Sequence, residues 1–276
     1  MPELPEVETI VRQLKHGHQG APPVLGRVIR DVEIHWARHI AEPEPELFQK
    51  KVSGNRILNL HRRAKYLVFS LERGTMLIHL KMTGDLTVHP DEEPLGKYDH
   101  TVFRFDNGWQ LRFSDARKFG KIYWLQDPES LLGKLGPEPL EAEFTPGVLR
   151  EQLEGRYRAI KPLLLEQSFV AGLGNIYADE SLHKAGLHPL RPADQLDEQD
   201  INALWKSIRS SLKQGIARHG TSLDWVYRGG NNQNYLRVYG REGEPCPDCG
   251  TTIERIVISQ RGTHFCPQCQ MEGEYS

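Results

Sequence analysis

The stretch CPDCGTTIERIVISQRGTHFCPQC, residues 246–269, contains all four cysteines of this 276-residue chain. They form two CxxC pairs, Cys246/Cys249 and Cys266/Cys269, with sixteen residues between the pairs. Two such pairs at this separation are typical of a tetrahedral zinc site, with each pair on a tight turn and a hairpin between them. Disulfide bonds are the alternative, but the first thirty residues lack a secretory signal. We therefore predict one zinc ion with a closed set of four ligands, which makes it structural and not catalytic.

A helical period precedes the cysteines. Apolar residues recur every three or four positions in TPGVLREQLEG (145–155), PLLLEQSFVAG (162–172), NIYADESLHKAG (175–186) and LDEQDINALWKSIRSSLKQGIARHG (196–220). Thr145–Pro146 is a typical helix start, and Gly220 is a typical stop. The segment 220–240 is rich in Gly and Asn, and we predict a long functional loop there.

The first half of the chain, residues 27–125, shows the period of two that is typical of strands. It includes RVIRDVEIHWARHI (27–40), KYLVFSLERGTMLIHLKMTG (65–84), HTVFRFDNGWQLRFSD (100–115) and KFGKIYWL (118–125). The triplets at 72–74 and 106–108 supply hairpin turns. After a helix beginning near Pro5, these strands predict an antiparallel sandwich or barrel. Residues 135–146, with three prolines and three glutamates, are predicted to link it to the helical half.

Composition indicates a globular protein with uneven charge. The chain is 38% hydrophobic and 26% charged, and it lacks the run of about 18 apolar residues that predicts a membrane span. Its net charge is −2, yet residues 50–121 hold 14 Lys/Arg against 8 Asp/Glu, whereas residues 127–154 hold 2 against 7. This charge gradient favours a basic face that binds an anionic polymer. The alternative interpretation is a charged sheet surface that is merely solvated.

The chain starts MPELPEVETI, which suits either catalysis or an ordinary helix start. Removal of Met1 would expose the secondary amine of Pro2, and such an amine attacks an aldehyde-like carbon to give a cationic iminium. Glu3 can transfer protons, and Glu6 lies within one helical turn of it. Pro5 followed by glutamates is also typical of a helix N-terminus, so this stretch alone leaves both interpretations open.

Other stretches suit contact with nucleic acid. GLGN (172–175) precedes a helix whose N–H groups favour a phosphate. RRAK (62–65) and DARKFG (115–120) place basic residues where strands begin. The aromatic ring in DARKFG could wedge between nucleotide bases. The cysteine hairpin adds Arg255 and Arg261. Each stretch also has a purely structural interpretation. GLGN can be a glycine turn, RRAK and DARKFG can be basic turn residues, and Arg255 and Arg261 can be solvated arginines.

Seven motifs, taken in order, resemble the formamidopyrimidine-DNA glycosylase family, the bacterial base-excision enzymes also called MutM. They are PELPEVET, RRAKYL, HLKMTG, DARKFG, GLGNIYADE, VYGREGEPC and SQRGTHFCPQCQ, and they span nearly the whole chain. The resemblance implies an α+β fold of two domains, the second carrying a four-cysteine zinc-finger β-hairpin. Its expected parts are an N-terminal catalytic antiparallel β-sandwich with flanking helices (1–134), a linker (135–146), a helix–two-turn–helix DNA-binding domain (147–240) with a lesion-capping loop (221–239), and the zinc finger (241–276).

The resemblance also implies a bifunctional DNA glycosylase and AP lyase of base-excision repair, acting on 8-oxoguanine and formamidopyrimidines in damaged double-stranded DNA. Pro2 would attack C1′ of the damaged nucleotide, form a Schiff base and cut the strand by β,δ-elimination, with Glu3 as proton shuttle and Glu6 in support. The other residues it assigns are Lys65 and Arg261 as catalytic phosphate contacts, Met82, Arg117 and Phe119 as fillers of the gap left by the flipped nucleotide, and His100, Lys161 and Asn175 as further DNA contacts. A monomer in the bacterial cytoplasm, associated with the nucleoid through DNA, is expected.

Several positions depart from the family pattern. The segment 15–26 is longer than usual, Lys81 replaces a small residue, Ala116 replaces a common proline, and the loop 221–239 is short. Endonuclease VIII-like specificity for oxidised pyrimidines is the enzymatic alternative, although PELPEVET and the lysine of RRAK favour purines. A DNA-binding scaffold without chemistry and a zinc-ribbon interaction protein are the non-enzymatic alternatives, and the intact N-terminal motif argues against both.

Overall fold

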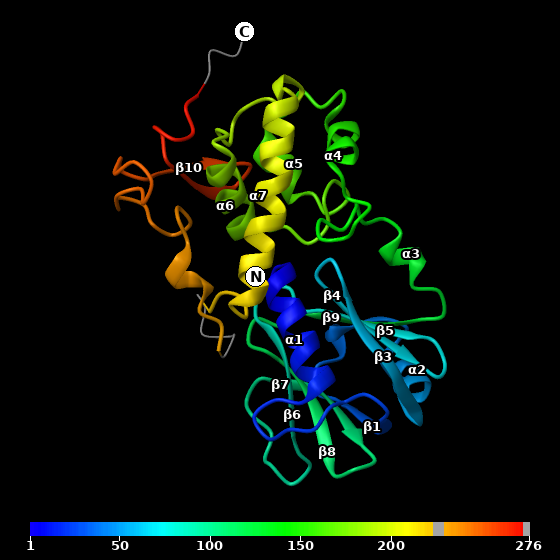
Figure 1. Cartoon of the computed structure of the whole chain (residues 1–276). Helices are drawn as coiled ribbons and strands as arrows, with labels where there is room; N and C mark the ends of the chain where they lie inside the picture. The colour runs from blue at the N-terminus through cyan, green and yellow to red at the C-terminus, as the bar shows by residue number, and fades with distance from the viewer. Residues whose placement is uncertain (223–228, 273–276) are drawn as a thin grey trace. The chain divides into compact units, whose positions relative to one another are not determined.

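The computed structural model describes residues 1–222 and 229–272. The chain divides into two compact units, Met1–Lys134 with Ser222–Gly229 and Leu135–Thr221 with Gly230–Ser276. Figure 1 shows strands predominating in the first unit, and helices with a two-stranded hairpin in the second. Within the described residues, no helix is both long and apolar enough to cross a membrane.

The first unit is built on a nine-stranded sheet in the order β2-β9-β5-β4-β3-β1-β7-β8-β6. Its strands are β1 (Val28–Ile34), β2 (Ile40–Glu42), β3 (Asn55–Arg63), β4 (Tyr66–Leu71), β5 (Thr75–His79), β6 (Gly84–Pro90), β7 (Asp99–Phe105), β8 (Trp109–Asp115) and β9 (Lys121–Leu125). Its helices are α1 (Leu4–His16), α2 (Pro45–Val52) and α3 (Glu129–Leu132). All neighbouring strands are antiparallel except β2 and β9. The four predicted strand segments and both hairpin turns are confirmed, whereas α2 was not predicted.

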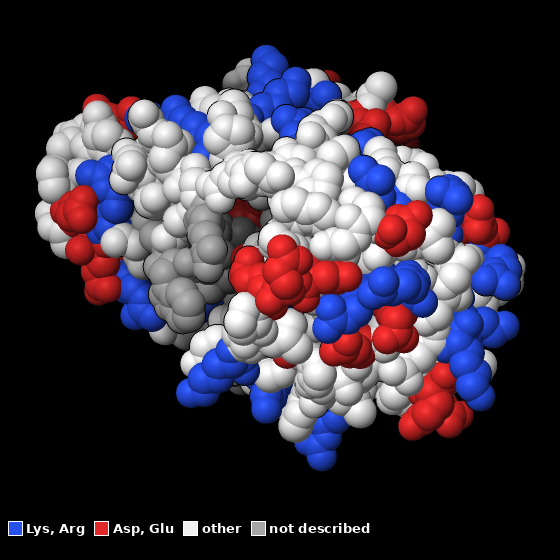
Figure 2. All heavy atoms as spheres, turned by 90° about the horizontal axis from the view of Figure 1, so that it is seen from below, with Lys and Arg blue, Asp and Glu red and all other residues white. Residues whose placement is uncertain are grey.

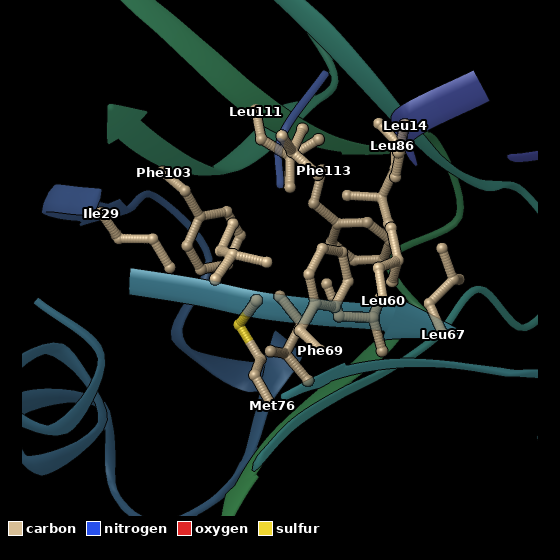
Figure 3. Close-up of a cluster of buried hydrophobic side chains, with 14 of the residues drawn as sticks. Leu14, Ile29, Leu60, Leu67, Phe69, Met76, Leu86, Phe103, Leu111 and Phe113 are labelled. Atoms are coloured by element: carbon tan, nitrogen blue, oxygen red, sulfur yellow. The ribbon is translucent and has the colours of Figure 1, made fainter. Parts of the chain in front are cut away.

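The sheet folds into two layers around one hydrophobic core. Figure 3 shows Phe69 and Met76, from one half of the sheet, pointing toward Phe103 and Phe113 from the other half. All four side chains are fully buried. Because each half buries one face against the other, the unit is the predicted sandwich and not an open sheet.

A β-bulge in β3 breaks the simple alternation of buried and exposed side chains. Ile57 pairs with Leu71 and Asn59 with Ser70, so Leu58 is the extra residue of the bulge. As a result Ile57 and Leu60 are both fully buried although three positions separate them, while Leu58 is 57% exposed. A strict period of two cannot predict this arrangement.

The long segment after α1 is a small ordered excursion. His18 and Ala21 exchange two backbone hydrogen bonds of 3.1 and 2.9 Å, and Gln19 and Gly20 both have positive φ between them. This is the geometry of a two-residue hairpin turn. The chain then returns to α1 through the hydrogen bond from Val24 N to Leu14 O, and the Val24 side chain enters the core.

The second unit contains a helix in each of the four predicted segments and the predicted hairpin, but the helix predicted over 162–172 is the shorter α5, which ends at Leu165. The elements are α4 (Pro146–Leu153), α5 (Ile160–Leu165), α6 (Asn175–Ala185), α7 (Glu198–Ala217), β10 (Glu254–Ile258) and β11 (Arg261–Phe265). α6 packs against α5, α7 and β11, and Figure 1 shows these helices side by side. Thr145 is the N-cap of α4, and its hydroxyl accepts a hydrogen bond from Val148 N. Gly136 N bonds to Gln167 O, so the predicted linker is packed within this unit.

Two leucines of β3 provide a matched test of the sandwich core. Leu60→Ala removes a fully buried side chain, whereas Leu58→Ala removes one that is mostly exposed. We expect Leu60→Ala to lower the free energy of unfolding by about 2–5 kcal/mol and Leu58→Ala to change it by less than about 0.5 kcal/mol. Chemical denaturation of both variants measures the difference. Equal losses would contradict the assigned register of β3.

Candidate functional site

The N-terminal motif forms a capped helix start that leaves Pro2 just outside the helix. Glu3 is the N-cap of α1, and its carboxylate accepts the backbone N–H of Glu6. In return the Glu6 carboxylate accepts the N–H of Glu3 at 2.9 Å. Both carboxylates and Pro2 are buried, whereas Met1 is 45% exposed. The two acids thus fix the direction of the chain at Pro2 while Met1 stays accessible to removal.

Arg62 ties this helix to the turn that carries Lys65. Its Nε donates to the Glu8 carboxylate of α1 at 3.3 Å, and its Nη1 donates to Ala64 O at 3.2 Å. Ala64 has a positive φ of 52°, and Lys65 beside it is buried. The RRAK turn is therefore held in a fixed conformation against α1. This gives the first arginine of the motif a role that sequence reasoning did not assign.

Lys81 occupies a backbone conformation that favours glycine. Its φ is +55°, which explains why a small residue is expected there. Its N–H donates to Nδ1 of His79 at 3.0 Å. Burial, with the charges of Lys81 and Lys65, lowers the pKa of His79 to about 3. His79 is therefore neutral at physiological pH and acts as an acceptor for the turn.

The three predicted gap-filling residues lie on two neighbouring loops of the first unit. Met82 lies between β5 and β6 and is 37% exposed, and Phe119 lies between β8 and β9 and is 49% exposed. The Arg117 guanidinium stacks on the Phe119 ring at 5.0 Å. Exposed apolar tips beside a guanidinium suit insertion into a base stack. His100, by contrast, is buried on β7, and burial followed by the charges of His39 and Lys118 lowers its pKa.

In the second unit Lys161 is an internal anchor. Its ammonium lies 2.6 Å from Asp179 Oδ1 and donates to Thr263 Oγ1 at 2.7 Å and to Gly262 O at 3.1 Å. Lys161 and Asp179 are both fully buried. These contacts join α5 and α6 to strand β11 of the β10–β11 hairpin. Direct phosphate contact by Lys161 stays a prediction, and its observed role is to position the hairpin.

Asn175 also holds the hairpin. Its side-chain amide donates to Gly262 O at 2.8 Å, which uses one of its two N–H donors within the protein. Asn175 begins α6 directly after Gly174, and the backbone N–H groups of that helix end are the usual donors to a phosphate. The predicted DNA contact of Asn175 stays a prediction.

Arg261 is presented by a two-residue turn. Ile258 pairs with Arg261, and Ser259 and Gln260 between them have φ of 46° and 62°. Two consecutive positive φ values are the geometry of a tight hairpin turn whose twist matches the strands. Arg261 is exposed directly after this turn. The turn thus offers a cation at the tip of a hairpin that Lys161 holds in place.

The four cysteines converge at the base of the same hairpin. Their sulfur atoms all lie within 4.8 Å of one another, with Sγ–Sγ distances of 3.8 Å for Cys246–Cys269, 3.4 Å for Cys249–Cys266 and 3.5 Å for Cys249–Cys269. Thiolates at about 2.3 Å around a tetrahedral zinc would lie about 3.8 Å apart. The donor set therefore fits one zinc ion, and four protein ligands leave no position for a substrate.

Contacts around the cysteines brace the metal centre. The N–H groups of Asp248 and Cys269 point at the sulfurs of Cys246 and Cys266, at 3.5 and 3.4 Å. Gln270 accepts from Cys266 N and donates to Leu187 O after α6, so it joins the cysteine turn to the helical part. Such outer contacts orient the ligands of a metal.

Charge on one face of the molecule is mixed. Figure 2 shows Lys/Arg and Asp/Glu groups lying side by side on that face. The positive excess of residues 50–121 is not gathered there into one basic field. On this face no broad basic field suits phosphate contacts, and the local cations on the loops described above are the features that do.

Comparisons with known proteins agree with this geometry. Family models match in chain order: the formamidopyrimidine-DNA glycosylase N-terminal domain over residues 1–122, its H2TH domain over 135–226, and the zinc finger found in FPG and IleRS over 243–270. The formamidopyrimidine-DNA glycosylase of Protochlamydia amoebophila is 44% identical over 98% of this chain and 99% of its own length. The chain belongs to the formamidopyrimidine-DNA glycosylase family.

Solved structures of this family match the whole fold. Wild-type Fpg (MutM) of Lactococcus lactis, bound to DNA containing N7-benzyl-Fapy-dG, has a TM-score of 0.91 and 39% identity over 98% of this chain and 100% of its own. MutM with DNA containing carbocyclic 8-oxo-G has a TM-score of 0.91 and 38% identity, with the same coverage. The predicted family, the α+β fold and the structural zinc site are confirmed.

The predicted capping loop, 221–239, lies partly outside the described residues, which resume at Gly229. At the end of this loop, the Glu180 carboxylate accepts the N–H groups of Arg237, Val238 and Tyr239 at 2.9–3.0 Å. Glu180 thus anchors the end of the loop to α6.

Sequence reasoning missed the residues that hold the site together. Asp179 and Glu180 lie within the GLGNIYADE motif, and Thr83 and Asp115 lie within HLKMTG and DARKFG. The motifs carried the family resemblance, and each supplied one or two contact residues. Sequence reasoning gave no role to Thr83 or to the buried acids of the motifs. An acid inside an apolar helix such as NIYADESL was the available signal, because a buried carboxylate needs donors.

Metal removal tests the zinc centre. Cys249→Ser removes one of four ligands, so we expect zinc content to fall from about one ion per chain to well below it, with a lower melting temperature. Gln268→Ala, an exposed position in the other cysteine turn that ligates no metal, is the control and should keep its zinc. Atomic emission on the purified full-length chain gives the content. Full zinc occupancy in Cys249→Ser would refute the assigned ligand set.

Proposed function

We propose that this chain excises oxidised purines from damaged double-stranded DNA as a bifunctional glycosylase and AP lyase, with Pro2 as nucleophile. The observation that carries the assignment is the placement of Pro2 directly before the capped first turn of α1, beside the buried carboxylates of Glu3 and Glu6. The named relatives are formamidopyrimidine-DNA glycosylases, and solved relatives hold DNA with Fapy-dG or 8-oxo-G lesions. These facts support an enzyme of base-excision repair.

The chemistry follows from a secondary amine. After Met1 is removed, the Pro2 nitrogen attacks C1′, the bond from C1′ to the damaged base breaks, and the base leaves with a proton. The nitrogen loses its one N–H proton on attack. The C1′–O4′ bond then breaks, with a proton delivered to O4′, so the sugar ring opens and the product is an iminium, which is cationic because its nitrogen has no further proton to lose. This cation draws electrons from C2′, whose proton is removed as the C3′–O bond breaks. A second elimination breaks the C5′–O bond, and water then releases Pro2.

Glu3 and Glu6 have different parts in this proposal. Glu3 adjoins Pro2 and is placed to give a proton to the departing base and to take protons during elimination. Glu6 accepts the Glu3 N–H, so it holds the chain that bears the nucleophile. Burial of both acids keeps competing water away from the iminium.

The remaining residues bind and open the DNA in this proposal. Lys65 and Arg261 contact phosphates of the lesion strand, and Met82, Arg117 and Phe119 fill the gap left by the everted nucleotide. Everting a nucleotide costs a few kcal/mol, which wedging side chains offset. The chain would act as a monomer on bacterial DNA, and so would associate with the nucleoid in the cytoplasm.

Covalent trapping tests the nucleophile. Incubation with a duplex containing 8-oxoguanine and borohydride should reduce the iminium to a stable protein–DNA adduct, seen by electrophoresis. Pro2→Gly should lower the adduct yield by at least about tenfold. Intact mass, measured on the same preparation, should show that Met1 is absent. An adduct at full yield in Pro2→Gly would refute the assignment of Pro2.

A second variant tests the proton shuttle. Glu3→Gln keeps an oxygen that can cap α1, so the fold should persist while base excision falls by about 10²–10⁴-fold. Glu46→Gln, the same change in the first turn of α2, is the matched control and should react at the wild-type rate. Single-turnover excision measures both. Wild-type excision by Glu3→Gln would contradict the role of Glu3.

A further inference from the structure

The two loops that carry the gap-filling residues meet through one threonine. The Thr83 hydroxyl, next to Met82, accepts the N–H of Arg117 at 3.0 Å. The same hydroxyl donates to Asp115 Oδ1. A single side chain therefore joins the loop between β5 and β6 to the loop between β8 and β9. The link is made at the residue adjacent to Met82 and at Arg117 itself.

Asp115 closes the second loop at both ends. Its Oδ1 accepts the N–H of Arg117 at 3.2 Å, and its Oδ2 accepts the N–H of Gly120 at 2.7 Å. Phe119 lies between these two anchored positions. A Cβ at Gly120 would lie 2.3 Å from the Phe113 ring, so the chain there is packed directly on the core. The loop that presents Arg117 and Phe119 is thus fixed by its own backbone.

The environment of Asp115 keeps its carboxylate charged. Asp115 is fully buried, and His39, also fully buried, places Nε2 3.5 Å from Oδ2. Although burial alone raises the pKa of Asp115, hydrogen bonds from His39, Thr83 and Gly120 lower it to about 2. The carboxylate therefore stabilises the folded state above pH 3.8 and loses this effect only as the pH falls toward 2.

The first loop is as tightly built as the second. Gly84 N donates to Leu80 O at 3.0 Å, closing the turn that contains Met82 and Thr83. Gly84 then pairs with Asp115 across β6 and β8. A Cβ at Gly84 would lie 2.5 Å from Leu80 O, so this turn has no room for rearrangement. Each loop thus has backbone contacts of its own, and the Thr83 hydroxyl joins the two loops.

We infer that Thr83 and Asp115 are positioning residues that make the two loops one rigid wedge. Met82 on one loop and Arg117 with Phe119 on the other then enter the base stack together, and the energy of each contact is available for eversion without a cost of ordering the loops. The inference rests on the proposed function, because it needs those three side chains to fill the gap. Neither Thr83 nor Asp115 touches DNA in this scheme.

The test compares two substitutions at position 83. Thr83→Val removes the hydroxyl at nearly constant volume, whereas Thr83→Ser retains it. Thr101→Val is the matched control, because the buried hydroxyl of Thr101 has no hydrogen-bond partner among the described residues. Stopped-flow fluorescence of a 2-aminopurine beside the lesion follows eversion. We expect Thr83→Val to slow this step by about five- to fiftyfold, and Thr83→Ser and Thr101→Val to stay within about threefold of wild type.

A substrate that needs no eversion separates this role from a general structural one. Borohydride trapping on a single-stranded oligonucleotide with a preformed abasic site has no stack to open, so Thr83→Val should trap it at the wild-type rate. Wild-type eversion by Thr83→Val would overturn the inference, and so would an equal loss of eversion and single-strand trapping. Failure of the wild-type chain to form any adduct would instead refute the proposed function.

A double-mutant cycle tests the joint action of the loops directly. With Thr83 present, Met82→Ala and Phe119→Ala should be strongly non-additive in the rate of excision, because each loop depends on the other. In the Thr83→Val background the two effects should multiply independently. Asp115→Asn, which cannot accept the Gly120 N–H with its amide nitrogen, should uncouple the loops in the same way. Additive effects in the presence of Thr83 would overturn the rigid wedge.

Discussion

The carboxylate of Asp179 lies fully buried in the second unit, 2.6 Å from the ammonium of Lys161. An unpaired charge at that depth would cost several kcal/mol, so this pair fixes everything joined to it. Asp179 Oδ2 also accepts the N–H of His264 on β11 at 2.9 Å, and Lys161 donates to Thr263 Oγ1 and Gly262 O. One ion pair therefore sets the hairpin on the helices. The orientation of Arg261 and of the cysteine turns follows from it.

The first unit uses the same physical constraint in two other places. The Glu3 and Glu6 carboxylates are buried and satisfy each other's backbone N–H groups, which leaves Pro2 in a defined position. Asp115 is buried and gathers the N–H groups of the loop that ends at Gly120. In each case a buried acid determines, through the backbone, where a contacting residue lies. Catalytic and binding groups are thereby held by partners that burial makes expensive to disrupt.

Much of the fold could be predicted because its periods are strong. The quoted strands, the cysteine hairpin and three helices of the second unit appear where the sequence places them, whereas α5 ends at Leu165, well before the predicted end at residue 172. The bulge at Leu58 could not be predicted, since it depends on pairing with β4. The helix α2 was missed because eight residues give too short a helical period to detect. The candidate site could likewise be predicted only in part. Motifs indicated its residues, but only the folded chain shows that donor groups of Lys161 and Asn175 point into the protein.

The Lys161 ammonium points into the protein, and this changes which basic residues we expect to contribute to DNA affinity. A cation contributes to phosphate binding through the counterions it displaces, and a cation already paired with a buried carboxylate displaces none. The charge of Lys161 is balanced within the protein by Asp179, whereas Arg261 is exposed directly after the turn of the hairpin. We therefore expect fewer phosphate contacts than the number of basic residues in the motifs. Lys161 maintains the shape of the hairpin that presents Arg261, and salt screens its buried ion pair much less than it screens exposed charges.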